Sequence, residues 1–268
     1  MQAYNKTDQQ LHWLSQTIAK ANRTYVTSKP DDSHTNLYYD DLDNRIVGRW
    51  INNGRDHLML TLNLATLNLE WLNSAKEVVQ SFETIGKTAT DIENELAGQL
   101  TGIYLNPNGF TDKLHFEIPE YPFTGEPISA INDADIHEWK TYRKLANVLC
   151  GLVLGYLELE GEIRIWPHHF DTGIYVEVGQ KLGLGFGLAM EDSMAGAPYF
   201  YLSAYPIHGI LEYTDLPDLG SGRWEVGENW KGAILPLSEL RNGIFEDNRQ
   251  VISDYLLKSI SFNCSFRS

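Results

Sequence analysis

Residues 58–64 run Leu-Met-Leu-Thr-Leu-Asn-Leu, with leucine at every second position. Side chains along a β-strand point alternately to its two faces, so this pattern predicts a strand with one apolar and one mixed face. The alternation starts at Leu58, and the strand is expected to reach about Leu72. A half-buried strand of this kind is typical of an antiparallel sheet. Two shorter strand-like stretches precede it, at 36–39 and 45–52.

Helices are expected on both sides of these strands. Residues 10–22 repeat apolar side chains at helical spacing from Leu11 to Ala21, which predicts an amphipathic helix. A more polar helix is expected over about 90–101, followed by a short strand at 114–118.

The second part of the chain repeats this order of elements. Asn132 or Asp133 is placed to cap a long helix that runs to about Leu157. A closing helix is expected over about 249–262. Between the two helices, strands are expected at 162–166, 173–178, 183–190, 198–205 and 233–235. The whole pattern predicts an α+β protein with a mainly antiparallel sheet and flanking helices.

The clearest linker is Tyr121-Pro-Phe-Thr-Gly-Glu-Pro127, which contains two prolines and one glycine. It predicts an N-terminal α+β half at 1–125 and a C-terminal α+β half at 126–268, although both could share one continuous domain. Aligning His12 with His137, at an offset of 125, superimposes the first helix of each half. This match and the shared order of elements indicate either two duplicated, fused halves or a chance similarity, and a period this long is not that of a solenoid.

The charge balance argues against nucleic acid as the main partner. The 268 residues include 21 Lys and Arg against 36 Asp and Glu, a formal net charge of −15. Binding to a polyanion depends on clustered Lys and Arg, and here the acidic excess is spread over both halves. A small molecule is the partner class that stays open, and the sequence fixes no oligomeric state.

Membrane insertion and disulfide bonding are not expected either. The longest apolar run, about Leu145 to Leu157, is shorter than the roughly 20 residues that a membrane helix needs. Residues 1–10 are polar and lack the apolar stretch of a signal peptide. The two cysteines, Cys150 and Cys264, are too few for a disulfide framework or a cysteine zinc site. A soluble cytoplasmic protein is expected.

The most distinctive local sequence is residues 164–172, Arg-Ile-Trp-Pro-His-His-Phe-Asp-Thr. If this stretch is extended, His169 and Asp171 lie on one face, and Trp166 and His168 lie on the other. A histidine and a carboxylate on one strand face suit a divalent-metal site, or an imidazole base held by an orienting carboxylate. They can equally hydrogen-bond each other or the backbone at a strand end.

This motif also carries a resemblance. Trp166-Pro-His-His-Phe-Asp171, the glycine-rich strand after it and Ala197-Pro-Tyr-Phe-Tyr201 together resemble an uncharacterised bacterial family, a domain of unknown function with a Trp-Pro-(Glu/His)-His-Phe-Asp motif. The match covers about residues 160–206. A more distant uncharacterised domain family is similar through its Leu-His helix and later Phe-Asp motif, which correspond to Leu11-His12 and Phe170-Asp171. The resemblance implies a type of domain and no reaction.

Two further carboxylates complete a candidate metal set. Glu191 and Asp192 follow the strand expected at 183–190 and could join His169 and Asp171 as mixed nitrogen and oxygen ligands. A divalent metal is the one cofactor that the sequence suggests. The alternative is that Glu191 and Asp192 form an acidic, solvated turn.

Glycines alternate in the same strand, as Gly183-x-Gly185-x-Gly187. This spacing is not that of a nucleotide-binding loop, and no helix follows it. Alternating glycines in a strand are expected to let an aromatic ring or another backbone come close.

Tyrosines alternate in the next strand. Tyr199 and Tyr201 fall on one face together with Ser203 and Tyr205. They could line a cleft as ligand-binding residues, together with Trp166 and His168, or form a cross-strand aromatic ladder.

Three other histidines are interpreted as structural or surface residues. Asp31, Asp32 and His34 form a short polar cluster, which is interpreted as an ordinary turn because the two aspartates belong to the turn-like stretch Lys29-Pro-Asp-Asp-Ser33. His12 and His137 lie near helix starts and are interpreted as capping or surface residues.

Three functions remain open on these grounds. The first is binding of a small molecule or a divalent metal at a site around His169 and Asp171. The second is a hydrolase-type enzyme with His169 as the base and Asp171 orienting it. The third is a non-catalytic interaction protein, so whether the chain is an enzyme stays undecided. No serine-hydrolase elbow, phosphate loop or helical zinc-protease motif is present in the sequence.

Overall fold

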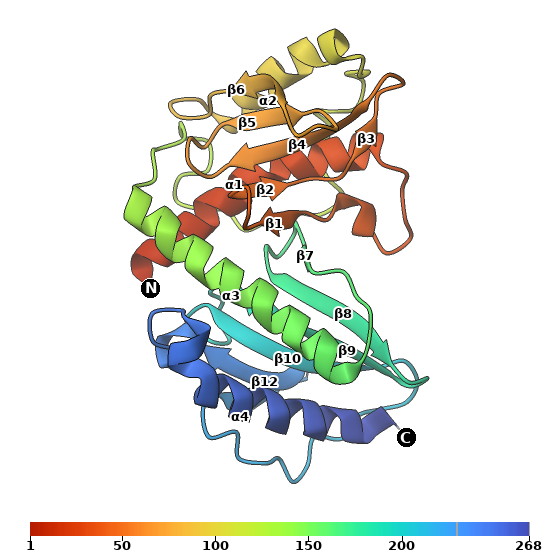
Figure 1. Cartoon of the computed structure of the whole chain (residues 1–268), viewed down its shortest axis with the longest axis vertical. Coiled ribbons are helices and arrows are strands. Elements are labelled where there is room, and N and C mark those ends of the chain that lie inside the picture. Colours follow the sequence, from red (N-terminus) through yellow and green to blue (C-terminus); the bar gives the residue numbers. More distant parts are fainter. Residues whose placement is uncertain (229, 268) are drawn as a thin grey trace. The chain divides into compact units, whose positions relative to one another are not determined.

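A computed structural model describes residues 1–228 and 230–267 (Figure 1). The chain divides into two compact units. Unit 1 contains Met1–Asn5, Thr141–Arg164 and Asp171–Ser268, and unit 2 contains Lys6–Lys140 and Ile165–Phe170. These units differ from the predicted contiguous halves because short segments are exchanged between them, and the His-His-Phe-Asp motif is split after Phe170.

Unit 2 begins with most of helix α1 (Gln2–Tyr25), which confirms and lengthens the helix expected at 10–22. Its apolar side chains at helical spacing are buried. The helix lies close to the strands that follow, since a β-carbon added at Gly48 would come within 2.8 Å of Ile18 and 2.7 Å of Asn22. Glycine is therefore needed where the chain passes α1.

The sheet of unit 2 is an antiparallel meander. Its strands are β1 (Tyr38–Asp40), β2 (Arg45–Val47), β3 (Ile51–Asn52), β4 (His57–Asn63), β5 (Leu69–Leu72) and β6 (Val78–Phe82). They follow the order β1-β2-β4-β5-β6, and β3 pairs with β4. The single strand expected from 58 to 72 is wrong, because it is a hairpin of β4 and β5 whose turn places Leu67 at a φ of 58°.

Helix α2 (Ala89–Gln99) follows the sheet and confirms the expected polar helix. Thr88 caps it, with its hydroxyl accepting the Asp91 amide, and the Asp91 carboxylate in turn accepts the backbone amide of Thr88. Residues 114–118, which were expected to form a strand, have no regular structure. Strand β6, which lies at the edge and alternates poorly, was not predicted.

Helix α3 (Asp133–Leu157) spans the boundary, and its part from Thr141 onward belongs to unit 1. The predicted cap is confirmed, since the Asn132 side chain accepts the Asp135 amide at 2.9 Å. The helix ends at the predicted Leu157.

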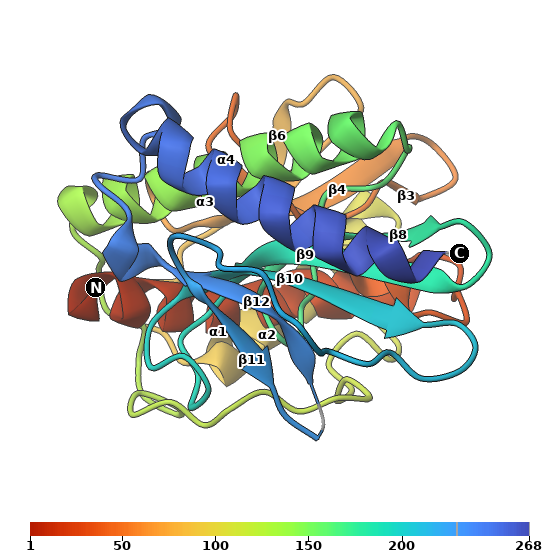
Figure 2. The ribbon, with the colours of Figure 1, turned by 90° about the horizontal axis from the view of Figure 1, so that it is seen from below.

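The second antiparallel sheet has the strand order β11-β12-β10-β9-β8-β7. The strands are β7 (Arg164–Ile165), β8 (Thr172–Val178), β9 (Leu182–Ala189), β10 (Tyr199–Pro206), β11 (Arg223–Val226) and β12 (Lys231–Pro236). β11 was not predicted. Helix α4 (Phe245–Cys264) lies across β10 and β12 (Figure 2), where the Tyr255 hydroxyl donates to the Ala233 carbonyl at 2.8 Å.

The predicted α+β class, with antiparallel sheets and flanking helices, is confirmed. The two sheets differ in strand order, since that of unit 2 follows the chain while β12 lies between β10 and β11 in unit 1. Internal duplication stays a prediction. Among the described residues, no helix combines the length and the apolar character needed to cross a membrane.

Candidate functional site

The motif predicted to be extended is a turn, which we call the motif turn (Trp166–Phe170). The amides of Phe170 and His169 donate to the Trp166 carbonyl, at 2.7 Å and 3.3 Å. Phe170 has a φ of 56°, in the left-handed region that bulky residues seldom adopt. The prediction of an extended strand is therefore wrong here, and the alternation that placed His169 and Asp171 on one face does not apply.

A buried histidine holds this turn in place. His12 Nε2 lies 2.9 Å from the carbonyl oxygen of Pro167, and Nδ1 lies 2.6 Å from the Tyr121 hydroxyl. A carbonyl only accepts, so a proton on Nε2 donates to Pro167 and Nδ1 accepts from the phenol. The His12 ring stacks on Phe170 with centroids 5.0 Å apart. The interpretation of His12 as a capping or surface residue is wrong, because it is 1% exposed in the middle of α1.

Gln16, one turn after His12, gives the same carbonyl a second donor. Its side-chain amide lies 2.8 Å from the Pro167 oxygen. Pro167 is buried, and a buried carbonyl needs hydrogen-bond donors. Helix α1 supplies both donors.

The motif turn forms one wall of a pocket within unit 2, which we call the motif pocket. Its volume is about 180 Å³. The opposite walls come from the 3₁₀ turn after α1 and from the loop before the Tyr121 linker. The lining residues are Asp31, Asp32, Thr35, Asn36, His115, Phe116, Trp166 and His168.

Two carboxylates give the motif pocket its charge. Asp32 Oδ2 lies 3.1 Å from His115 Nε2, and both side chains are about half exposed. Asp31 Oδ1 accepts the Ser33 amide at 3.2 Å. Asp32 has a φ of 54° and begins the 3₁₀ helix Ser33–Thr35, so the turn expected around these residues is present. The same turn aims acidic side chains at the pocket.

The imidazole of His168 is neutral at physiological pH. Burial lowers its pKa from 6.5 to about 4, and the neighbouring His169 and His115 act in the same direction. Its ring lies 5.5 Å from that of Phe116 and 4.3 Å from that of His169, measured between centroids. The side chain therefore contributes an aromatic surface and no charge.

His34 lies in the chain between the pocket residues Asp32 and Thr35 but does not line the pocket. It is 4% exposed, and its Nδ1 accepts the Lys29 amide at 3.2 Å. Burial lowers its pKa, although Asp32 opposes that effect. The histidine therefore closes the turn that carries Asp31 and Asp32.

Asp171, the last residue of the motif, belongs to unit 1 and is 9% exposed. Its Oδ2 accepts the hydroxyl of Tyr201 at 2.6 Å. Burial, and then the charge of Asp171, raises the pKa of the Tyr201 phenol far above its ordinary value. The phenol is therefore a permanent donor to a buried carboxylate. His169, by contrast, is exposed on the motif turn in unit 2.

The other predicted metal ligands also contact protein groups. Asp192 Oδ2 accepts the Tyr199 hydroxyl at 2.7 Å, while its Oδ1 accepts the amides of Met194 and Ala195. Glu191 accepts the side-chain amide of Asn5. Throughout residues 1–228 and 230–267, no group of three or more His, Cys, Asp or Glu side chains is arranged to hold a metal ion.

The alternating glycines behave as predicted. A β-carbon added at Gly183 would come within 2.1 Å of the Tyr175 hydroxyl, and one at Gly187 within 2.9 Å of the Tyr201 hydroxyl. At Gly185 the nearest ring is that of Tyr205, at 3.1 Å. Tyr201 and Tyr205 of β10 and Tyr175 of β8 therefore pack against the glycine backbone of β9.

Several residues at or near the motif pocket were not predicted from local sequence patterns. His115 and Phe116 lie in the stretch that was expected to be a strand, and Tyr121 lies in the linker. The one available signal was the Leu-His pair of α1, which the more distant resemblance had already singled out together with Phe170-Asp171.

Comparisons with protein-family models, with curated proteins and with solved structures found no match. The chemistry of the motif pocket is therefore the basis for assigning a function.

Proposed function

We propose that this protein binds a small organic cation, such as a compact quaternary or primary ammonium group, in the motif pocket. The observation that carries the proposal is the convergence of two carboxylates and several aromatic rings on one small hollow. The proposal keeps Trp166 and His168 as ligand-binding residues and replaces His169 and Asp171 by Asp31 and Asp32 as the charged groups.

Charge favours a cation. Asp31 and Asp32 line the pocket, and His115 contacts Asp32 at 3.1 Å. His168 adds no positive charge because its pKa is about 4. A unit positive charge about 4 Å from a carboxylate gains roughly 1–4 kcal/mol, depending on how far water is excluded. The net charge of −15 also favours a cationic ligand over an anionic one.

Aromatic surfaces favour an organic cation over a bare ion. Trp166, Phe116 and His168 line the pocket together with the carboxylates. A cation within about 6 Å of an aromatic ring gains roughly 0.5–2 kcal/mol from the electrons of the ring face. Alkylated ammonium groups also bury their methyl groups against such rings, and a volume of about 180 Å³ suits a head group of that size.

The experiment compares choline with its neutral isostere 3,3-dimethyl-1-butanol by isothermal titration calorimetry. We expect choline to bind at least about fivefold more tightly, since one charge interaction is worth about 1 kcal/mol. The test variant is Asp32→Asn, because asparagine tolerates the left-handed backbone of Asp32 and removes only the charge.

The matched control is Asp112→Asn, which removes the same charge from an exposed side chain that does not line the pocket. We expect Asp32→Asn to weaken choline binding and Asp112→Asn to leave it unchanged. Equal affinities for choline and the neutral alcohol in the unaltered protein would refute the proposal.

A further inference from the structure

Unit 2 contains a second and larger pocket, which we call the sheet pocket. It lies on the mixed face of the sheet, the face that carries Met59 and Thr61, and its volume is about 510 Å³. No residue of the motif pocket lines it. The lining residues are Val26, Tyr38, Val47, Gly48, Arg49, Trp50, Met59 and Lys76.

The floor and one wall of the sheet pocket are apolar. Tyr38 and Val47 are paired across β1 and β2 and form the floor together with Met59 of β4. Trp50 also lines the pocket and is 43% exposed. An indole ring left open beside an apolar floor provides a surface on which a flat ring can stack.

The charged residues that line the sheet pocket are both cations. Arg49 is held in place, because its Nε donates to the Ser33 carbonyl at 2.9 Å and its backbone amide donates to Asn22 Oδ1 at 2.9 Å. The guanidinium carbon lies 5.2 Å from the centre of the Tyr38 ring. A positive charge is therefore fixed above an aromatic floor before any ligand arrives.

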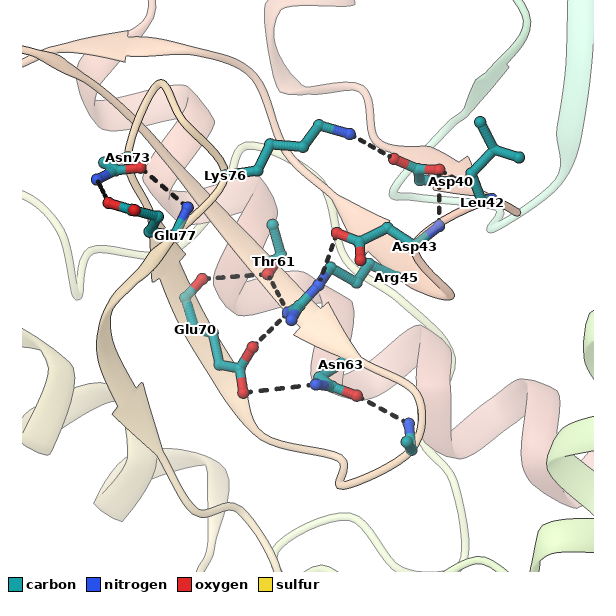
Figure 3. Close-up of polar contacts among 11 residues, drawn as sticks. Asp40, Leu42, Asp43, Arg45, Thr61, Asn63, Glu70, Asn73, Lys76 and Glu77 are labelled. Carbon is teal, nitrogen blue, oxygen red and sulfur yellow. Dashed lines mark hydrogen bonds and ion pairs between the residues drawn. The ribbon is translucent and has the colours of Figure 1, made fainter.

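Lys76 is the second cation, and it can move. It projects from the turn between β5 and β6 toward Asp40 (Figure 3), with Nζ 3.1 Å from Oδ2 and its side chain 54% exposed. Exposed ion pairs contribute little stability. Asp40 also accepts the amides of Leu42 and Asp43, so its carboxylate keeps partners if Lys76 turns to a ligand.

We propose that the sheet pocket binds an aromatic carboxylate, with the ring stacked between Trp50 and the floor and the carboxylate between Arg49 and Lys76. The chain has 36 acidic and only 21 basic residues, yet both charged residues that line this pocket are basic. Two cations beside an aromatic surface favour an anionic ligand. The ligand differs in charge from the one proposed for the motif pocket, so either proposal can be refuted without affecting the other.

The test uses indole-3-acetate and its neutral analogue indole-3-acetamide, titrated into the full-length protein by calorimetry. The acetate is expected to bind about fivefold more tightly than the amide, because it alone carries the charge. Phenyl phosphate is a third probe, and tighter binding of it than of the acetate would reassign the site to phosphate esters and overturn the carboxylate proposal.

Variants then locate the site. Lys76→Gln is expected to weaken acetate binding about threefold to fivefold and to leave amide binding unchanged, whereas Trp50→Ala should weaken both. Lys87→Gln is the matched control, because Lys87 is also paired with a carboxylate in unit 2 but does not line the pocket. Melting curves show that each variant is folded.

Two further results would also overturn the proposal. One is that Lys87→Gln weakens acetate binding as much as Lys76→Gln does, which would mean that only overall charge matters. The other is that neither indole probe binds at millimolar concentration.

Discussion

The Nε2 atom of His12 lies 2.9 Å from the carbonyl oxygen of Pro167, although 155 residues separate the two along the chain. The same imidazole stacks on Phe170. The two short motifs that carried the sequence resemblance, Leu-His in α1 and His-Phe-Asp after β7, therefore meet at this ring. Helix α1 fixes the turn that presents Trp166 and His168 to the motif pocket.

Replacing His12 by alanine is expected to lower the free energy of unfolding by about 2–4 kcal/mol, through a cavity beside Phe170 and the loss of a buried donor. Gln16→Ala is the matched control, because it removes the other donor to Pro167 and should cost about 1 kcal/mol. Urea denaturation measures both. If the two variants lost equal stability, His12 would not be the residue that secures the motif turn.

Gly187→Ala is expected to lower the free energy of unfolding by about 1–3 kcal/mol. A β-carbon there would lie 2.5 Å from the Thr172 carbonyl oxygen, which belongs to the backbone of the paired strand and cannot turn aside. Gly151→Ala in α3 is the control. Gly151 is exposed, and an added β-carbon meets nothing within 4 Å.

That control should raise the free energy of unfolding by about 0.5–1 kcal/mol, because alanine favours the helix. Thermal melts of both variants give the comparison. Similar losses in the two proteins would mean that the Thr172 carbonyl does not exclude a β-carbon at Gly187.

Local sequence signals predicted the elements that depend on local interactions. Helix α3 was found from its cap at Asn132 to its end at Leu157, because capping and periodicity are encoded within the segment itself. The hairpin of β4 and β5 was missed because leucines continue through its turn. Leu67 in that turn adopts a left-handed backbone conformation, which the sequence pattern does not predict.

The motif pocket was missed for the same kind of reason. Phe170 adopts a left-handed conformation, which is rare for a bulky residue and invalidates the alternation rule across it. The partner that stabilises this turn, His12, comes from a distant segment, and no local pattern predicts such a contact. Trp166 and His168 were identified because they lie in the distinctive motif, whereas His115 and Phe116 lie in a segment without periodicity.

Glu70→Leu is expected to lower the free energy of unfolding by about 3–5 kcal/mol, because it removes the buried carboxylate partner of Arg45 and leaves only the more exposed Asp43. Arg45 contacts Glu70, Thr61 and Asp43 on the mixed face of the unit 2 sheet (Figure 3). Replacing both charges, in Arg45→Met with Glu70→Leu, should recover most of the loss.

The control for this pair is Arg249→Ala, which breaks an exposed ion pair with Glu246 on α4 and should cost less than about 1 kcal/mol. Chemical denaturation of the three proteins tests the expectation. If the double variant is no more stable than Glu70→Leu, the ion pair itself stabilises the protein. The loss in Glu70→Leu would then not come from the buried charge of Arg45.

His168 should make stability depend on pH. Its pKa is lowered from 6.5 to about 4 in the folded state, so between these values the unfolded chain binds more protons. The stability that His168 contributes is therefore complete above pH 6.5 and is lost as the pH falls toward 4. His168→Gln should flatten the profile of unfolding free energy against pH over this range. Parallel profiles for the two proteins would contradict a desolvated, neutral imidazole at this position.

Asp171 should prove to be a structural residue. Its carboxylate is buried and accepts the Tyr201 hydroxyl at 2.6 Å, and a hydrogen bond to a buried charge is worth roughly 1.5–3 kcal/mol. Asp171→Asn should therefore lower the free energy of unfolding by an amount of that order, and Tyr201→Phe by a similar amount because it removes the hydroxyl that donates to the same carboxylate.

Choline binding at the motif pocket should be unchanged in both variants, because neither Asp171 nor Tyr201 lines that pocket. Calorimetry at a temperature where both variants are folded distinguishes a structural role of Asp171 from a role in ligand binding. If Asp171→Asn abolished choline binding while the fold persisted, the carboxylate would belong to the ligand site after all, and the assignment of the charged groups to Asp31 and Asp32 would have to be abandoned.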